Sequence, residues 1–130
     1  MTPLIESLDA ACPGYVPGPY AEGLAYTWMS GFVRHVIQVR LDGREDEVRA
    51  VFSVIERQLE TDRPGFELSD DSNLAVAGFL EDMQNGNLHV PGSKPADFRA
   101  YLGPRSLERW EALNGFWGAV EHSKSGRKPD

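Results

Sequence analysis

The hydrophobic and polar positions repeat with the period of an α-helix along most of the chain, most clearly over residues 44–61. The apolar side chains there return every three or four positions, in a stripe that consists of Val48, Val51, Phe52, Ile55 and Leu59. The first turn of this segment is acidic, and negative side chains stabilise the positive end of the helix dipole. The pattern therefore predicts a helix over residues 44–61 with one buried face.

Two further helices are predicted before this one. Thr2 followed by Pro3 places a capping hydroxyl before a proline in the first turn, which indicates a short helix through about Ala11. A connector rich in proline and glycine follows, and a wide apolar face then indicates a second helix over about residues 20–41. We expect its apolar side to hold Leu24, Trp28, Phe32, His35, Val36 and Val39.

The segment after Ser69 is expected to form the centre of the domain. Ser69 is a favourable N-cap, and apolar side chains then point almost all the way round the helix axis. These side chains are Leu74, Ala75, Val76, Ala77, Phe79, Leu80 and Met83. Only Gly78, Glu81 and Asp82 interrupt this surface, on one narrow strip, so the helix should pack against several neighbours.

The last third of the chain contains turns and one long helix. Asn-Gly and Pro-Gly pairs indicate a loop over residues 84–93, and a short helix is expected after Pro95, over residues 93–102. A final helix is predicted over residues 104–121, with an apolar side made of Trp110, Leu113, Phe116, Trp117 and Val120. Residues 122–130 are polar and basic without an apolar anchor, which predicts a mobile tail.

Composition and length fit one folded unit. The chain has 130 residues and a hydrophobic fraction of 41%, which is enough apolar surface for one core. Its one β-like run, residues 36–39, lies inside a helical period, so no strand is predicted. The predicted fold class is all-α, an irregular helical bundle of five to six helices that forms a single domain over residues 1–121.

Several features point to the cytoplasm. No apolar run reaches the length of about 18 residues that a membrane-spanning helix needs. The N-terminal stretch has no basic region and contains Glu6 and Asp9, which argues against a secretory signal. A single cysteine, Cys12, cannot form an internal disulfide and agrees with a reducing compartment.

Charge is the feature that suggests a partner. The formal net charge is −7, and residues 42–82 hold twelve acidic and only four basic side chains. Such an acidic block repels nucleic acids and anionic membranes and favours a basic protein partner. The candidate partner-binding residues are Asp46, Glu60, Asp62, Asp70, Asp71 and Asp82. The alternative is a solvated acidic surface that only keeps the protein soluble.

Motifs for catalysis, metals and cofactors are absent from the sequence. The three histidines and the cysteine do not have the spacing of metal ligands, and no phosphate-binding or dinucleotide-binding glycine pattern occurs. Cys12 is expected at a helix C-terminus, where the dipole disfavours a thiolate, so we interpret it as a structural thiol. We therefore assign no catalytic residue, no metal site and no cofactor.

A possible pocket between helices is the best enzymatic alternative. Glu56 and Glu81 each lie at the border of an apolar helix face, where loss of solvent can raise the pKa of a carboxyl group for acid–base chemistry. His35, beside Trp28 and Phe32, is a candidate pH switch or ligand contact. The simpler interpretations are border glutamates in water and a histidine at the edge of the core that donates to a backbone carbonyl.

Three segments carry a resemblance to a class of proteins. They are FSVIERQLE at residues 52–60, AGFLEDMQ at 77–84 and YLGPRSLERWEALNGFW at 101–117. Their layout resembles small bacterial helical proteins of the toxin-immunity type, which implies a binding role and supplies no catalytic residue. Sequestration of a basic partner is therefore the first hypothesis. A small enzyme that uses Glu56 or Glu81, and a structural self-associating module, remain as alternatives, and the oligomeric state stays open.

Overall fold

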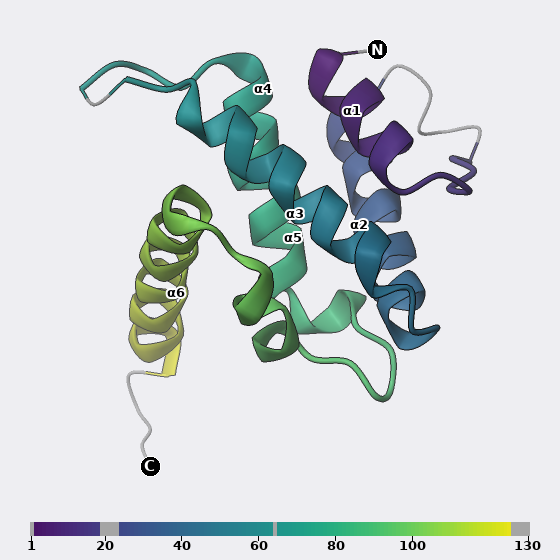
Figure 1. The fold of residues 1–130 in the computed structure, drawn as a ribbon. Coiled ribbons are helices and arrows are strands. Elements are labelled where there is room, and N and C mark those ends of the chain that lie inside the picture. Colours follow the sequence, from purple (N-terminus) through teal and green to yellow (C-terminus); the bar gives the residue numbers. More distant parts are fainter. Residues whose placement is uncertain (1, 19–23, 64, 126–130) are drawn as a thin grey trace.

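The computed structural model describes the backbone of residues 2–18, 24–63 and 65–125, and the side chains of the same ranges as far as residue 115. The part of the chain that it describes is all-α, with no strand, and forms one helical domain, as the hydrophobic pattern predicts (Figure 1). Its helices are α1 (Pro3–Ala11), α2 (Ala25–Leu41), α3 (Glu45–Glu60), α4 (Asp70–Asn73), η2 (Leu74–Leu80), α5 (Glu81–Gln84), η3 (Gly86–Leu88), η4 (Pro95–Tyr101) and α6 (Pro104–Ser125).

Two of the predicted helix starts are confirmed at atomic level. The Thr2 hydroxyl accepts a hydrogen bond from the Ile5 backbone N–H at 3.1 Å, and the Ser69 hydroxyl accepts one from Ser72 at 3.1 Å. Each hydroxyl satisfies one of the backbone donors that a helix leaves unpaired in its first turn. In contrast, Leu24 is an exposed residue with extended backbone just before α2, so it does not belong to the apolar face as expected.

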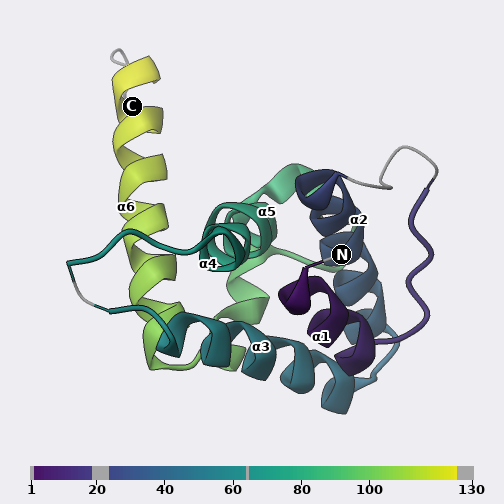
Figure 2. The same cartoon turned by 90° about the horizontal axis from the view of Figure 1, so that it is seen from above.

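The core lies where α3 crosses the other helices. Helix α3 packs against α1, α2 and α6, and the segment α4–η2–α5 lies behind it (Figures 1 and 2). All five residues of its predicted stripe are buried, with exposed fractions of at most 2%. The C-terminal part of α6 extends beyond the other helices in Figure 2. The amphipathic pattern of α3 thus explains why the remaining helices assemble around it.

The central segment Asp70–Gln84 is one continuous helical stretch, but its middle part, η2, is a π-helix. Phe79 and Leu80 are fully buried, which confirms the central position. Gly78 is also buried rather than part of a polar strip. It packs closely against α2, since a Cβ atom there would lie 3.2 Å from Met29 Cγ. Ala77 is exposed, so burial is less complete than the apolar pattern predicts.

The connector between α1 and α2 is held to the domain by Tyr15. Its ring packs edge-on against Trp28 at 5.3 Å and against Phe32 at 5.9 Å between ring centroids. The residue beneath it is Gly31, where a Cβ atom would lie 1.9 Å from the Tyr15 hydroxyl and would displace the ring. The Tyr15 ring thus covers one face of the first half of α2.

The C-terminal elements follow the predicted order with shifted boundaries. The short helix after Pro95 is a 3-10 helix that ends at Tyr101, and α6 begins at Pro104 as predicted. Helix α6 continues through Ser125, past the predicted boundary at residue 121, and residues 126–130 lie outside the described part, as do the side chains of Phe116, Trp117 and Val120. Among the described helices, none has both the length and the apolar character needed to cross a bilayer.

Candidate functional site

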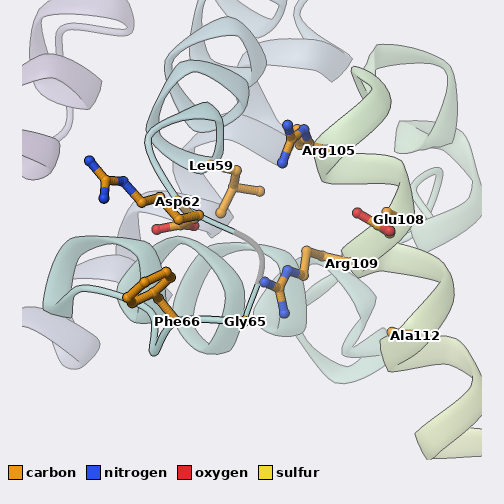
Figure 3. A pocket seen from close by; sticks show the side chains of 9 residues that line it. Leu59, Asp62, Gly65, Phe66, Arg105, Glu108, Arg109 and Ala112 are labelled. Atoms are coloured by element: carbon orange, nitrogen blue, oxygen red, sulfur yellow. The ribbon is translucent and has the colours of Figure 1, made fainter.

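A hollow of about 600 Å³ lies between the end of α3, the connector to α4 and the first turns of α6 (Figure 3). We call it the α3–α6 groove. It is lined by Leu59, Asp62, Arg63, Gly65, Phe66, Arg105, Glu108, Arg109 and Ala112. The lining combines charged side chains of both signs with an aromatic ring, which is a composition suited to binding rather than to packing.

One wall of the groove depends on Glu56 of α3. The two oxygens of its carboxylate accept hydrogen bonds from the backbone N–H groups of Arg105 and Ser106 at 2.9 Å, and from the Ser106 hydroxyl at 2.8 Å. These groups belong to the first turn of α6, where backbone donors lack helical partners. A Cβ atom on Gly103 would lie 2.6 Å from the Glu56 carboxylate, so a larger residue there would push this carboxylate from its position. Glu56 therefore fixes the start of α6 against α3.

This role corrects the prediction that Glu56 is an acid–base group with a raised pKa. Burial raises the pKa of Glu56, but the hydrogen bonds from Ser106 and Arg105 lower it by more than burial raises it. The net pKa therefore lies below the ordinary glutamate value. Hydrogen bonds to the charged form of a carboxyl group have this effect. Glu56 is a structural cap that stays ionised at neutral pH.

The opposite wall is held by Ser72, which is fully buried at the start of the central segment. The Ser72 hydroxyl donates to Asp62 Oδ1 at 2.8 Å and accepts from Gln58 Nε2 at 3.0 Å. Both partners lie at or just beyond the end of α3. The serine thus joins the end of α3 to the beginning of α4 and fixes the position of the connector between them. The second oxygen of Asp62 is buried and has no hydrogen-bond partner among the described residues.

The side chains of Arg105 and Arg109 leave α6 toward the groove (Figure 3). They are four positions apart, so they lie on the same face of the helix. Neither forms an ion pair within 4.0 Å with any described residue. Phe66 of the connector also lines the groove, and 69% of its surface is exposed. The arrangement offers guanidinium donors and an apolar ring to a ligand.

Three of the six predicted partner-binding carboxylates are engaged inside the domain. Asp62 accepts from Ser72, Asp71 accepts from the Leu4 backbone N–H at 3.1 Å, and Asp82 accepts from the Ser30 hydroxyl at 2.8 Å. Burial raises the pKa of Asp82 more than the Ser30 hydroxyl lowers it. These carboxylates connect helices, and their availability to a partner is reduced accordingly.

The other three, Asp46, Glu60 and Asp70, are exposed but do not form one surface. Asp46 lies in the first turn of α3 and Glu60 at its end, about 21 Å apart at the helical rise per residue. Asp70 lies near Glu60, because Ser72 holds the start of α4 to the end of α3. The predicted acidic surface is thus divided between two ends of the domain. A role for these residues in partner binding stays a prediction.

Glu56, Glu81 and His35, the predicted pocket residues, have separate surroundings. Burial and the neighbouring Asp82 raise the pKa of Glu81, whereas Glu56 is occupied by α6. His35 packs against Tyr15 at 5.8 Å between ring centroids, and its Nε2 atom is buried without a hydrogen-bond partner in the described part of the chain. The expected bond from His35 to a backbone carbonyl is therefore not made by Nε2, and none of the three residues lines the α3–α6 groove.

Cys12 has the environment of a structural thiol. It is fully buried, and burial together with the carboxylate of Glu47 raises its pKa to about 11. A thiol with this pKa stays protonated near neutral pH and is a poor nucleophile. Elsewhere in the described ranges, no three histidine, cysteine or acidic side chains gather closely enough to hold a metal ion.

Of the groove residues, Asp62 was among the binding candidates that the sequence suggested, whereas Arg105, Arg109 and Phe66 were not. Counting charge over long blocks hides Arg105 and Arg109, because acidic and basic residues alternate along α6. The signal that identifies them is their spacing: two arginines four positions apart near a predicted helix start must lie on one face. Phe66 carried no such signal, since a lone aromatic residue in a connector is compatible with burial or exposure.

Comparison with known proteins identifies the family. Residues 5–118 match a domain of unknown function, DUF7674. The chain belongs to the DUF7674 family. The match runs from within α1 to about two thirds of the way along α6 and therefore includes the whole α3–α6 groove. No curated protein and no solved structure shows significant similarity to the chain.

Proposed function

We propose that this DUF7674 protein is a protein-binding module whose contact surface is centred on the α3–α6 groove. The observation that carries the proposal is the exposure of Phe66 beside Arg105 and Arg109, which have no internal ion-pair partner in the described chain. Aromatic residues and arginine are enriched among the side chains that dominate binding energy at protein interfaces. An exposed phenylalanine in a hollow is costly to leave in water and gains from a partner.

The surroundings of the groove suit a protein partner. A specific interface buries roughly 800 Å² on each side, so the groove forms its centre and neighbouring exposed residues form its rim. Glu60 and Asp70 are exposed at the same end of the domain. Together with the net charge of −7, they attract a partner with basic surface and speed its association. The resemblance to proteins of the toxin-immunity type supports sequestration of such a partner.

The first test is capture from a native lysate by four forms of the whole protein, namely wild type, Phe66→Ala, Arg109→Gln and the control Arg49→Gln. Arg49 is an exposed residue of α3 whose partner is Glu45, and it lies outside the groove. We expect wild type and Arg49→Gln to retain the same protein, identified by mass spectrometry, and the two groove variants to lose it. Equal capture by all four forms, or no specific protein with wild type, contradicts the proposal.

The contribution of the rim is tested by the association rate with the captured partner. Glu60→Lys places a positive charge beside the groove, and Asp46→Lys makes the same change at the far end of α3. We expect Glu60→Lys to slow association by roughly tenfold at low salt and Asp46→Lys to have a smaller effect. Equal rates for both variants mean that charge near the groove does not guide the partner.

A further inference from the structure

The described arginines of the domain fall into two groups, with and without an ion-pair partner. Arg40, Arg44, Arg49 and Arg99 each have a carboxylate oxygen within 4.0 Å. The second group, without such a partner among the described residues, consists of Arg34, Arg57, Arg63, Arg105 and Arg109. Three of these line the groove, and Arg105 and Arg109 reach into it from the same face of α6 (Figure 3). A guanidinium group is a planar array of five donors that matches the two oxygens of a carboxylate. The groove therefore has donor capacity for a carboxylate that the domain does not supply.

The other side of the groove is apolar. The ring of Phe66 is 69% exposed, and Leu59 forms part of the lining from the end of α3. A ligand that occupies both sides must carry an acidic group and an apolar side chain close together. Adjacent residues of a protein segment meet this requirement, because two neighbouring side chains of an extended chain lie only a few ångströms apart.

We propose that the α3–α6 groove binds an acidic segment of the partner protein, with one carboxylate between Arg105 and Arg109 and a neighbouring apolar side chain against Phe66. This inference rests on the proposed binding function and names the chemistry that the groove recognises. A partner that is basic over most of its surface can still present one such segment, because the net charge governs the approach and the local contact governs the fit.

The same residues disfavour a polyanion. Asp62 and Glu108 also line the groove, and the whole chain carries a net charge of −7. A nucleic acid places a negative charge every few ångströms and would meet these carboxylates as well as the arginines. A single carboxylate of a peptide segment adds only one negative charge to the groove and needs only the guanidinium groups as partners. The charge pattern therefore favours a protein segment.

The test is a nuclear magnetic resonance titration of the full-length protein with two blocked pentapeptides. The probes are acetyl-Gly-Phe-Glu-Leu-Gly-amide and the same peptide with Gln in place of Glu. We expect the Glu peptide to produce saturable shifts of the Arg105 and Arg109 side-chain signals and of the Phe66 ring, and to bind at least fivefold more tightly than the Gln peptide. Arg105→Gln and Arg109→Gln should each weaken binding of the Glu peptide about fivefold or more, and Arg49→Gln should leave it unchanged.

Several results would overturn the inference. Equal affinity for the two peptides, or shifts that avoid the groove, removes the carboxylate site. Inorganic phosphate that produces the same shifts at equal or lower concentration shows a small-anion site instead. Arg105 is exposed, so its variant remains informative even if Arg109→Gln fails to fold. If lysate capture depends on Phe66 but neither peptide binds, the binding function stands and this inference falls. If the Glu peptide binds but no protein is captured, the proposed function falls instead.

Discussion

At the start of α3 the arginines lie against carboxylates of the same domain, whereas at its end they face an open groove. Arg44 pairs with Glu47 at 2.7 Å and Arg49 with Glu45 at 3.7 Å, and Glu45 also accepts from the Tyr101 hydroxyl. At the far end, Arg105 and Arg109 have no such partner among the described residues. We call these two regions the closed end and the open end.

The aromatic residues differ in the same way. Tyr15 covers Trp28 and Phe32 on α2, in close contact with Gly31. At the open end, Phe66 leaves most of its ring in water. The open end thus combines an exposed aromatic ring with arginines that have no ion-pair partner among the described residues, whereas the arginines at the start of α3 are paired. Capacity to bind a partner is greatest where internal partners are missing.

The largest effect is expected from a pair of phenylalanines. Phe79 is fully buried in the core that both ends share, and Phe66 is exposed at the open end. Phe79→Ala should lower the free energy of unfolding by about 3–5 kcal/mol, because it leaves a cavity. Phe66→Ala should change it by less than about 0.5 kcal/mol. Urea denaturation measures both values, and a large loss from Phe66→Ala would mean that its ring is part of the core.

A pair of helix glycines comes next. Gly31→Ala should cost about 1–3 kcal/mol, because its new methyl group displaces the Tyr15 hydroxyl that packs on α2. Gly115→Ala on α6 meets no other atom within 4 Å and should stabilise the domain by up to about 1 kcal/mol through helix propensity. Thermal unfolding gives the sign of each change. Equal signs for the two variants would contradict the close contact between Gly31 and Tyr15.

The third pair of substitutions compares Glu56, whose carboxylate caps α6, with the exposed residue Glu60. Glu56→Ala removes the hydrogen bonds to Arg105 and Ser106, and should cost about 1–2 kcal/mol. Glu60 is also on α3 but is exposed, so Glu60→Ala should have almost no effect on stability. Urea midpoints of the two variants provide the measurement. Similar losses would show that the Glu56 hydrogen bonds contribute little in water.

The smallest effects are expected in the dependence of stability on pH. The folded pKa of Glu56 is lowered below 4.5, so its contribution is present above that pH and is lost as the pH falls through the folded value. The folded pKa of Asp82 is raised above 3.8, so its contribution is present at lower pH and is lost as the pH rises through the folded value. Glu56→Gln should therefore flatten the acid side of the stability curve. Asp82→Asn should remove the opposite trend, and unchanged curves for both variants would contradict these assignments.

Local features of the fold could be predicted from the sequence. The apolar period of α3, the Thr2 cap and Pro104 define helices because each acts over one or two helical turns. The π-helical part of η2 could not be predicted in this way. Apolar residues surround the axis there, so the pattern has no face that would distinguish one helical repeat from another.

The candidate site could be predicted much less well, because it depends on contacts between distant residues. Asp71 reaches Leu4 across 67 positions, and Glu56 reaches Ser106 across 50. Periodicity tells which side of a helix a carboxylate occupies and gives no information about the donor that it meets. The acidic block therefore looked like one surface, although half of its candidate carboxylates connect helices.

The cap that Glu56 provides also has a kinetic consequence. The Thr2 cap forms between residues three positions apart, whereas the start of α6 gains its carboxylate only when segments 50 positions apart meet. Contacts of long sequence separation require costly loop closure and tend to form late in folding. Substitution of Glu56 should therefore speed unfolding more than it slows folding, as stopped-flow measurements can show. The wall of the groove is then among the last parts of the chain to fold. A partner that binds it would therefore distinguish fully folded molecules from partly folded ones.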